Sequence, residues 1–224
     1  MHPIAVDGTY NARGIGDPDR PWLVRSAAVD ELSAQGEHTL RGLGVTLVLD
    51  LRERDERAPH THGLPVHSQP LYGTAPPASG SLEEVYATLV DERGAELARA
   101  VAVIAEHDDA VLVHCAAGKD RTGLVVALCR LVAGDSRAEI LADYALSERT
   151  VAPARGALVE AQLDREGLTG SARAEARRLH LLSPESALDE ALDRVASHGG
   201  AAAYLRANGL PAAALARLET RAAR

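Results

Sequence analysis

The fold is decided by residues 110–133, AVLVHCAAGKDRTGLVVALCRLVA. The first five residues, Ala110–His114, form a short apolar run that predicts a buried strand. The segment Thr122–Ala133 is apolar on nearly every face, which is typical of a helix buried on all sides. A loop of small and charged residues lies between them. The stretch therefore predicts a strand, a tight loop and a helix in direct succession.

The segments before this stretch repeat the alternation of strand and helix. The run Val45–Leu51 (VTLVLDL) predicts a second buried strand, and Trp22–Ala27 and Leu64–Leu71 predict shorter ones. A helix is expected over Asp30–Leu43. A further helical pattern begins at Ser81, which stands three residues before a glutamate in the spacing of a capping box. A break in that pattern is expected near Gly94, since glycine disfavours helix interiors.

The chain after residue 133 predicts helices alone. Strands that alternate with helices, followed by helices only, indicate an α/β fold: a central, mostly parallel sheet flanked by helices, with an all-helical C-terminal part. We expect one domain over residues 1–224, with a core at about 10–135 and a helical region at about 136–224. That helical region either forms a lid over the ligand site at the end of the sheet or only packs against the core. The expected helices are Ser136–Arg149, Val151–Leu163, Arg173–Leu181, Pro184–Ser197, Ala201–Asn208 and Pro211–Arg221.

Composition excludes several classes of protein. The net charge of -8 and the pI of about 5.6 disfavour a general binder of nucleic acid or of anionic membranes. The first 20 residues lack a signal-peptide pattern, and no apolar run is long enough to anchor the chain in a membrane. Two cysteines cannot build a disulfide framework. We therefore expect a cytoplasmic protein, with export without a recognisable signal as the alternative, and the oligomeric state stays open.

The loop after Ala110–His114 has the composition of a phosphate site. In parallel sheets, ligands bind at the carboxyl ends of the strands, where this loop lies. Its small residues Ala116, Ala117 and Gly118 let backbone N–H groups turn inward, and the following helix adds positive potential at the same point. The guanidinium of Arg121 offers a planar fork for two phosphate oxygens.

The same loop carries a nucleophile and an acid. The positive field favours the thiolate form of Cys115, which can attack phosphorus and form a cysteinyl-phosphate. Thr122 is placed to hydrogen-bond that thiolate. Asp120 is the candidate general acid and Asp50, at the end of a neighbouring strand, is an alternative. We expect His114 to orient the loop by hydrogen bonds rather than act as a base. This chemistry needs no metal or cofactor.

Residues His114–Gly123 resemble the signature loop of cysteine-dependent protein tyrosine phosphatases. They are most similar to the bacterial tyrosine/lipid branch, whose loop reads H-C-x-x-G-K-D-R-T-G. The resemblance implies that Cys115 is the nucleophile, Arg121 the phosphate ligand and Asp120 a general acid carried by the loop itself. Lys119 stands where phosphoinositide phosphatases share a lysine. Phosphorylated proteins or peptides and phosphoinositides are therefore the implied substrates.

The likeness extends to short patterns outside the loop. Residues 50–56 fit the family's D-L-R-x-x-x-E, residues 143–147 its D-Y-x-x-S and residues 204–209 its Y-L-x-x-x-G. One position departs from the family, because the N-terminal N-x-R-D-x-G pattern has Gly14 in place of its aspartate. The departure leaves open what that aspartate would orient.

Other chemistry-bearing residues have plainer interpretations. Lys119 is the single lysine among the 24 basic residues. We expect its compact ammonium to add positive electrostatic potential to the loop or to contact a second phosphate. Arg52 and Glu56 are expected to form a structural ion pair beneath the loop. Cys129 is expected to be a small core hydrophobe, with a redox partnership to Cys115 as the alternative. A solvated loop, rather than a metal site, is expected for His60, His62 and His67.

The leading hypothesis is a phosphomonoesterase that uses Cys115 to hydrolyse phosphotyrosine, with phosphoserine, phosphothreonine and phosphoinositides as further candidate substrates. A catalytically weak phosphate-binding module, suggested by Gly14, and another thiolate enzyme, such as an arsenate reductase or a sulfur transferase, are the alternatives. The expected site comprises the catalytic residues Cys115, Asp120 and Arg121, the substrate-binding residues Ala116, Ala117, Gly118, Lys119, Arg121 and Thr122, and the supporting residues His114, Gly123, Asp50 and Arg52.

Overall fold

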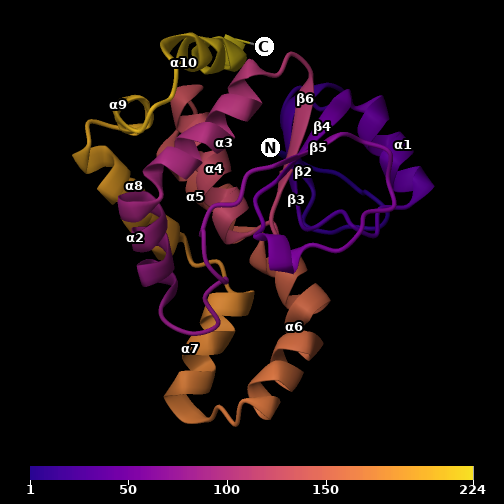
Figure 1. Cartoon of the computed structure of the whole chain (residues 1–224), viewed down its shortest axis with the longest axis vertical. Helices are drawn as coiled ribbons and strands as arrows, with labels where there is room; N and C mark the ends of the chain where they lie inside the picture. The colour runs from indigo at the N-terminus through magenta and orange to yellow at the C-terminus, as the bar shows by residue number, and fades with distance from the viewer. Residues whose placement is uncertain (224) are drawn as a thin grey trace.

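The computed structural model describes residues 1–223 and has a six-stranded sheet at its centre (Figure 1). The strand order is β1-β2-β3-β6-β4-β5, in which β3, β6, β4 and β5 run parallel and β1 and β2 are antiparallel. The expected α/β fold with a mostly parallel sheet is confirmed. The strands are β1 (His2–Pro3), β2 (Arg13–Gly16), β3 (Pro21–Ser26), β4 (Val45–Asp50), β5 (Val66–Ser68) and β6 (Ala110–His114).

Helices cover both faces of the sheet. Because successive side chains of a strand point to opposite faces, each central strand contributes to two cores. Leu49 and Val111 face the larger core, which most of the helices complete. Val48 and Leu112 face a smaller core on the side of α1. The helices are α1 (Ala34–Gly42), α2 (Leu82–Glu92), α3 (Gly94–Glu106), α4 (Asp120–Val132), α5 (Arg137–Ala145), α6 (Glu148–Arg165), α7 (Gly170–Leu181), α8 (Glu185–Ser197), α9 (Ala201–Ala207) and α10 (Ala212–Glu219).

The register of the parallel strands brings three chain segments to one edge. His114, the last residue of β6, is paired with Ser26 of β3 and with Asp50 of β4. All three strands therefore end at the same level, and the loop from Cys115 to Lys119 begins there. The buried helix α4 follows at Asp120. The strand, loop and helix expected for residues 110–133 are confirmed.

The helix boundaries expected around Ser81 and Gly94 are confirmed, and one expected helix is wrong. The Ser81 hydroxyl accepts from the Glu84 N–H at 3.1 Å and the Glu84 carboxylate accepts from the Ser81 N–H at 3.1 Å, so the capping box is confirmed. The break at Gly94 is also confirmed, because α2 ends at Glu92 and α3 begins at Gly94. The single helix expected over Ser136–Arg149 is wrong, since the chain turns after α5 and starts α6 there.

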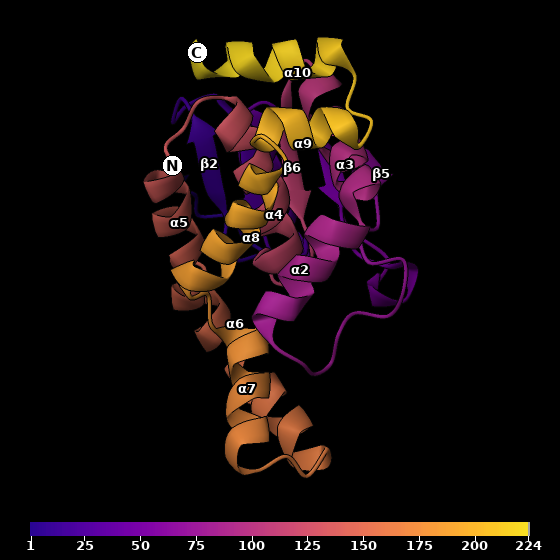
Figure 2. The same cartoon turned by 90° about the vertical axis from the view of Figure 1, so that its left-hand side faces the viewer.

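Helices α6 and α7 form a hairpin that projects from the rest of the molecule (Figure 2). They pack on each other through a separate small core of Val159, Leu163, Ala176 and Leu181. The two ends of the hairpin nearest the sheet approach the edge where β6 ends (Figure 1). Within residues 1–223, no helix has the length and apolar character needed to cross a membrane.

Candidate active site

A narrow cavity of about 150 Å³ lies at the carboxyl end of β6. Cys115, Asp120 and Arg121, the three residues expected to be catalytic, all line it, and so do Ala116 and Ala117. Only 4% of Cys115 is exposed, so the thiol is reached through the cavity rather than from open solvent. The structure thus brings the expected thiol, carboxylate and guanidinium into one small space.

Gly118 gives the loop its tight turn. Its φ of +64° lies in the left-handed region, and an added Cβ would lie 2.1 Å from the Ser26 carbonyl oxygen. The close approach lets the loop rest directly on the end of β3. Glycine is therefore required at this position by backbone geometry and by space.

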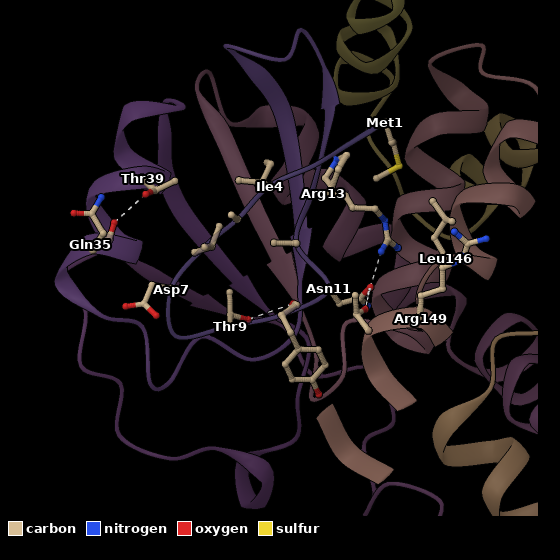
Figure 3. A pocket seen from close by; sticks show the side chains of 16 residues that line it. Met1, Ile4, Asp7, Thr9, Asn11, Arg13, Gln35, Thr39, Leu146 and Arg149 are labelled. Carbon is tan, nitrogen blue, oxygen red and sulfur yellow. Dashed lines mark hydrogen bonds between the residues drawn. The ribbon is translucent and has the colours of Figure 1, made fainter. Parts of the chain in front are cut away.

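A buried network holds the back of this loop. The Nδ2 atom of Asn11 donates to the carbonyl oxygens of Ala117 and Gly118, both at 3.0 Å, and Arg25 Nη2 donates to the Gly118 oxygen at 2.7 Å. Figure 3 shows Asn11 beside Arg13, whose Nη1 donates to Asn11 Oδ1 at 2.5 Å. These bonds fix the outward carbonyls of the loop and so leave its N–H groups to turn toward the cavity.

Asp143 of α5 binds the two arginines of this network together. Its carboxylate accepts from Arg13 Nε at 2.7 Å and from Arg25 Nη1 at 2.8 Å, and all three side chains are at most 6% exposed. Burial alone would raise the pKa of Asp143, but the two guanidinium charges lower it below its usual value. Ser147 completes the network by accepting from Arg13 Nη2 at 3.0 Å. The N-terminal and 143–147 sequence patterns therefore meet in one structural unit.

The departure at Gly14 is explained by its neighbours. A Cβ added to Gly14 would lie 2.4 Å from Nε2 of His2, on the adjacent strand β1, and near Pro21. Arg13 precedes it and points into the buried network, so Gly14 faces the other side of the strand. The position is filled by the ring of His2 and does not contact the loop.

Arg121 is oriented by Glu56. The carboxylate accepts from Nη1 at 2.5 Å and from Nη2 at 2.7 Å, and the guanidinium lies over the Tyr72 ring at 4.7 Å. This contact uses the end of the guanidinium. Its side edge, the Nε–H and the second Nη2–H, has no hydrogen-bond partner among the residues described. That edge matches two oxygens of a phosphoryl group.

The expected Arg52–Glu56 ion pair is wrong. Arg52 binds Asp30 at 2.6 Å and Asp50 at 2.9 Å, whereas Glu56 binds Arg121. Two carboxylates already surround the buried Arg52, which leaves the Glu56 side chain to reach the loop. A single 3-10 turn, Arg54–Glu56, lies between the two residues.

His114 and Asp50 support the loop from below. Burial lowers the pKa of His114, which keeps the ring neutral, and Nδ1 lies 3.1 Å from the Cys115 carbonyl oxygen. Asp50 is outside the cavity lining and its carboxylate is held by Arg52 through Nε and Nη2. Burial would raise the pKa of Asp50, but these bonds lower it. A lowered pKa and this position make Asp50 unsuitable as a proton donor in the cavity.

Asp120 lies at the start of α4 with its carboxylate toward the cavity. Its Oδ1 is 3.4 Å from the Tyr86 hydroxyl and 3.5 Å from the Tyr144 hydroxyl. Burial raises the pKa of both phenols well above their ordinary value, so both stay protonated and donate to the carboxylate. The Lys119 Nζ is a further 3.6 Å neighbour. Asp120 is thus fixed in direction by two hydroxyl donors and one ion pair.

Lys119 does not line the cavity. Its side chain is 1% exposed, and Nζ donates to the carbonyl oxygens of Leu179 and Leu182, both at 2.7 Å. Burial lowers the pKa of Lys119, partly offset by the charge of Asp120. In this structure the single lysine fastens the end of α7 to the loop, and the contact with a substrate phosphate suggested by the sequence is not made.

Replacing Lys119 with methionine is expected to loosen α7. Two carbonyl groups lose a charged donor, and an unsatisfied buried polar group costs about 1–3 kcal/mol. We expect a lower melting temperature and faster amide hydrogen exchange over residues 170–182. The control is Arg177→Met, which removes a solvent-accessible pair between Arg177 of α7 and Glu160 of α6. Unchanged exchange in Lys119→Met would contradict this role for the ammonium.

The α4 residues from Thr122 to Arg130 are buried. The Thr122 hydroxyl oxygen has no hydrogen-bond partner among the described residues, and Gly123 leaves room for the Tyr144 ring, 3.1 Å from where a Cβ would stand. Burial raises the pKa of Cys129 to about 12, as expected for a core thiol. Of the three loop histidines, His60 and His62 stack with ring centroids 4.5 Å apart. His62 is only 5% exposed, so the solvated loop expected for these histidines is wrong at this position. Within the described part of the chain, no three potential metal ligands gather.

Sequence reasoning missed several residues of the cavity. Tyr72 lies in a Gly/Pro-rich segment that predicts only a linker, and Arg155 of α6 and His180 of α7 lie in helices that carry no recognisable pattern. Nothing local marks these positions, since they reach the loop only through the α6–α7 hairpin and the segment before α2. The Gly/Pro-rich composition around Tyr72 indicates a surface loop. Loops at the carboxyl end of a parallel sheet often line the binding site, so this composition was the one available signal for Tyr72.

Comparison with known proteins agrees with this geometry. The sequence model of the tyrosine phosphatase family matches residues 4–223, and the chain belongs to that family. A tyrosine-protein phosphatase of Nostoc commune is 33% identical over 140 residues, which cover 56% of this chain and 48% of the relative. The chain thus spans about half the length of that relative. The triple specificity protein phosphatase PtpB of Mycobacterium tuberculosis is 31% identical over 201 residues, covering 69% of this chain and 72% of the relative.

Proposed function

We propose that the chain hydrolyses phosphate monoesters, first of all phosphotyrosine in proteins or peptides, through a cysteinyl-phosphate intermediate. The observation that carries the proposal is the convergence of Cys115, Asp120 and the unoccupied edge of Arg121 on one cavity. Four other cavities on residues 1–223 have no cysteine in their linings.

The first half-reaction follows from this placement. The Cys115 thiolate attacks phosphorus, so that an S–P bond forms while the bond from phosphorus to the leaving oxygen breaks. Asp120 donates a proton to the departing oxygen, and Arg121 together with the loop N–H groups binds the phosphoryl oxygens. The unpartnered Thr122 hydroxyl is available to the sulfur as it becomes a leaving group.

The second half-reaction releases phosphate. Asp120, now ionised, accepts a proton from water, which attacks phosphorus and breaks the S–P bond. Inorganic phosphate leaves and the thiolate is restored. The two tyrosine hydroxyls on Asp120 hold the carboxylate in one orientation through both steps.

The walls of the cavity support phosphotyrosine. The Tyr72 ring, Pro77 and Val85 are apolar and surround the approach to the nearly buried Cys115. An aryl group is long and flat enough to carry its phosphate past such walls, whereas a serine side chain is short. The name of the mycobacterial relative supports testing a wider range that includes phosphoserine, phosphothreonine and phosphoinositides. Both cysteines are free thiols, which agrees with the cytoplasmic location that we propose.

A turnover panel tests the proposal. Phosphotyrosine, phosphoserine and phosphothreonine peptides and phosphoinositide vesicles are offered to the chain with and without a chelator. We expect the highest kcat/KM for phosphotyrosine and no effect of the chelator. Turnover of none of these substrates at any pH between 5 and 8 would contradict the proposal and favour a binding module. Formation of a persulfide on Cys115 would favour a sulfur transferase.

Asp120→Asn is expected to separate substrates by their leaving groups. An amide cannot donate the proton, so phenyl phosphate should lose about 10²–10⁴-fold in kcat and p-nitrophenyl phosphate far less, because nitrophenolate departs without protonation. Asp50→Asn is the comparison for the other acid considered. Equal losses for both substrates in Asp120→Asn would show that another residue supplies the proton.

A further inference from the structure

Arg155 is a second cation in the cavity, and it comes from outside the loop. It lies on α6 and lines the same cavity of about 150 Å³ as Cys115 and Arg121. A water molecule takes up about 30 Å³ of liquid, so this space holds only a few waters or one phosphoryl group with its first neighbours. Anything bound on the loop is therefore close to Arg155.

Arg155 is poorly satisfied in this structure. Its Nε is buried without a hydrogen-bond partner among the described residues, and within residues 1–223 the side chain forms no ion pair with a carboxylate. By contrast, Arg121 forms an ion pair with Glu56, and Lys119 donates its hydrogen bonds to carbonyl oxygens at the end of α7. A buried donor without an acceptor is costly, and a phosphoryl oxygen in the cavity would supply one.

Neighbouring groups also place Arg155 beside the reacting centre. Burial raises the pKa of Tyr10, and the charge and hydrogen bond of Arg155 lower it while the charge of Cys115 raises it. Burial lowers the pKa of His180 and of Lys119, and the charge of Arg155 adds to both shifts. Arg155 therefore stands among loop and α7 groups, with a neutral phenol rather than an acid as its partner.

We propose that Arg155 binds the phosphoryl group held on the 115–121 loop, so that α6 contributes a substrate-binding residue to the site. This inference rests on the proposed function, since it assigns a ligand to the same cavity. The α6–α7 hairpin then takes part in recognition: an occupied loop offers Arg155 its missing acceptor, and an empty loop does not.

Binding of inorganic orthophosphate tests the inference without relying on turnover. Isothermal titration is carried out on the wild type, Arg155→Gln, Arg155→Lys and Arg165→Gln. The control Arg165 is an exposed arginine at the far end of the same helix. Loss of one charge-assisted hydrogen-bonding group should raise the Kd of Arg155→Gln by about 10- to 100-fold. The Kd of Arg155→Lys should lie between those of the wild type and Arg155→Gln. The Kd of Arg165→Gln should stay within about twofold of the wild type, as for other exposed charges.

The outcomes separate this inference from the proposed function. A folded Arg155→Gln with the wild-type Kd for phosphate overturns the role of Arg155, whatever the turnover. A raised Kd in a chain that hydrolyses nothing supports Arg155 and removes the phosphatase proposal alone. Equal weakening in Arg155→Gln and Arg165→Gln shows only a general charge effect and also overturns the inference. A wild type that neither binds phosphate nor hydrolyses esters defeats both.

Discussion

Cys115→Ser is expected to abolish turnover of every phosphate monoester, with kcat lowered by at least about 10⁴-fold. A serine hydroxyl is protonated at neutral pH and no base in the cavity is placed to activate it, since Asp120 must act as an acid in the first step. The replacement is close to isosteric, so the melting temperature and phosphate binding should change little. Steady-state kinetics with p-nitrophenyl phosphate measures the loss.

The second cysteine provides a matched control. Cys129 is fully buried in the core of α4 and does not line the cavity. Cys129→Ala should therefore lower stability slightly and leave kcat within a few-fold of the wild type. If Cys115→Ser kept a substantial part of the activity, the nucleophile would have to be sought elsewhere. Similar losses in the two variants would also speak against a specific role for Cys115.

Asp143→Ala is expected to have the largest effect on stability. It removes the one carboxylate that accepts from both Arg13 and Arg25, and breaking a buried ion pair by deleting one partner costs about 3–5 kcal/mol. The 115–121 loop should also lose its fixed position, because Arg25 binds the Gly118 carbonyl and Arg13 orients Asn11. We therefore expect a lower free energy of unfolding and a raised KM together.

Urea unfolding of Asp143→Ala and of Asp193→Ala measures this difference. Asp193 pairs with Arg137 at the surface, where its side chain is 69% exposed, so its loss should cost less than about 1 kcal/mol. Equal destabilisation of the two variants would show that the buried network is not a structural support. A destabilised Asp143→Ala with wild-type KM would show that the network does not position the loop.

Much of the site could be predicted because its chemistry is local in sequence. The ten residues from His114 to Gly123 contain the thiol, the carboxylate and the guanidinium, and the strand and helix around them were marked by apolar runs. The parallel strands Val45–Asp50 and Ala110–His114 were predicted almost to the residue. Strands buried on both faces are short apolar runs rich in β-branched residues, and both segments have that composition.

The parts that were missed depend on contacts between distant segments. Strands β1 and β2 were not expected, since two residues and a Gly-rich tetrapeptide carry no strand pattern. They form because β2 pairs with the edge of β3 and β1 pairs in turn with β2. Glu56 was assigned to the wrong arginine because spacing along the chain does not show which partner lies across the loop. The position of Lys119 could not be foreseen, because its acceptors are carbonyls about 60 residues away.

The central claim is that Cys115 carries the phosphoryl group between substrate and water. Rapid acid quench during turnover of p-nitrophenyl phosphate, followed by digestion and mass spectrometry, tests it most directly. We predict a phosphorylated peptide whose modification maps to Cys115, increased in Asp120→Asn because water activation slows, and absent in Cys115→Ser. A phosphate found on a histidine, serine or aspartate instead, or turnover with no covalent intermediate in any variant, would contradict the account.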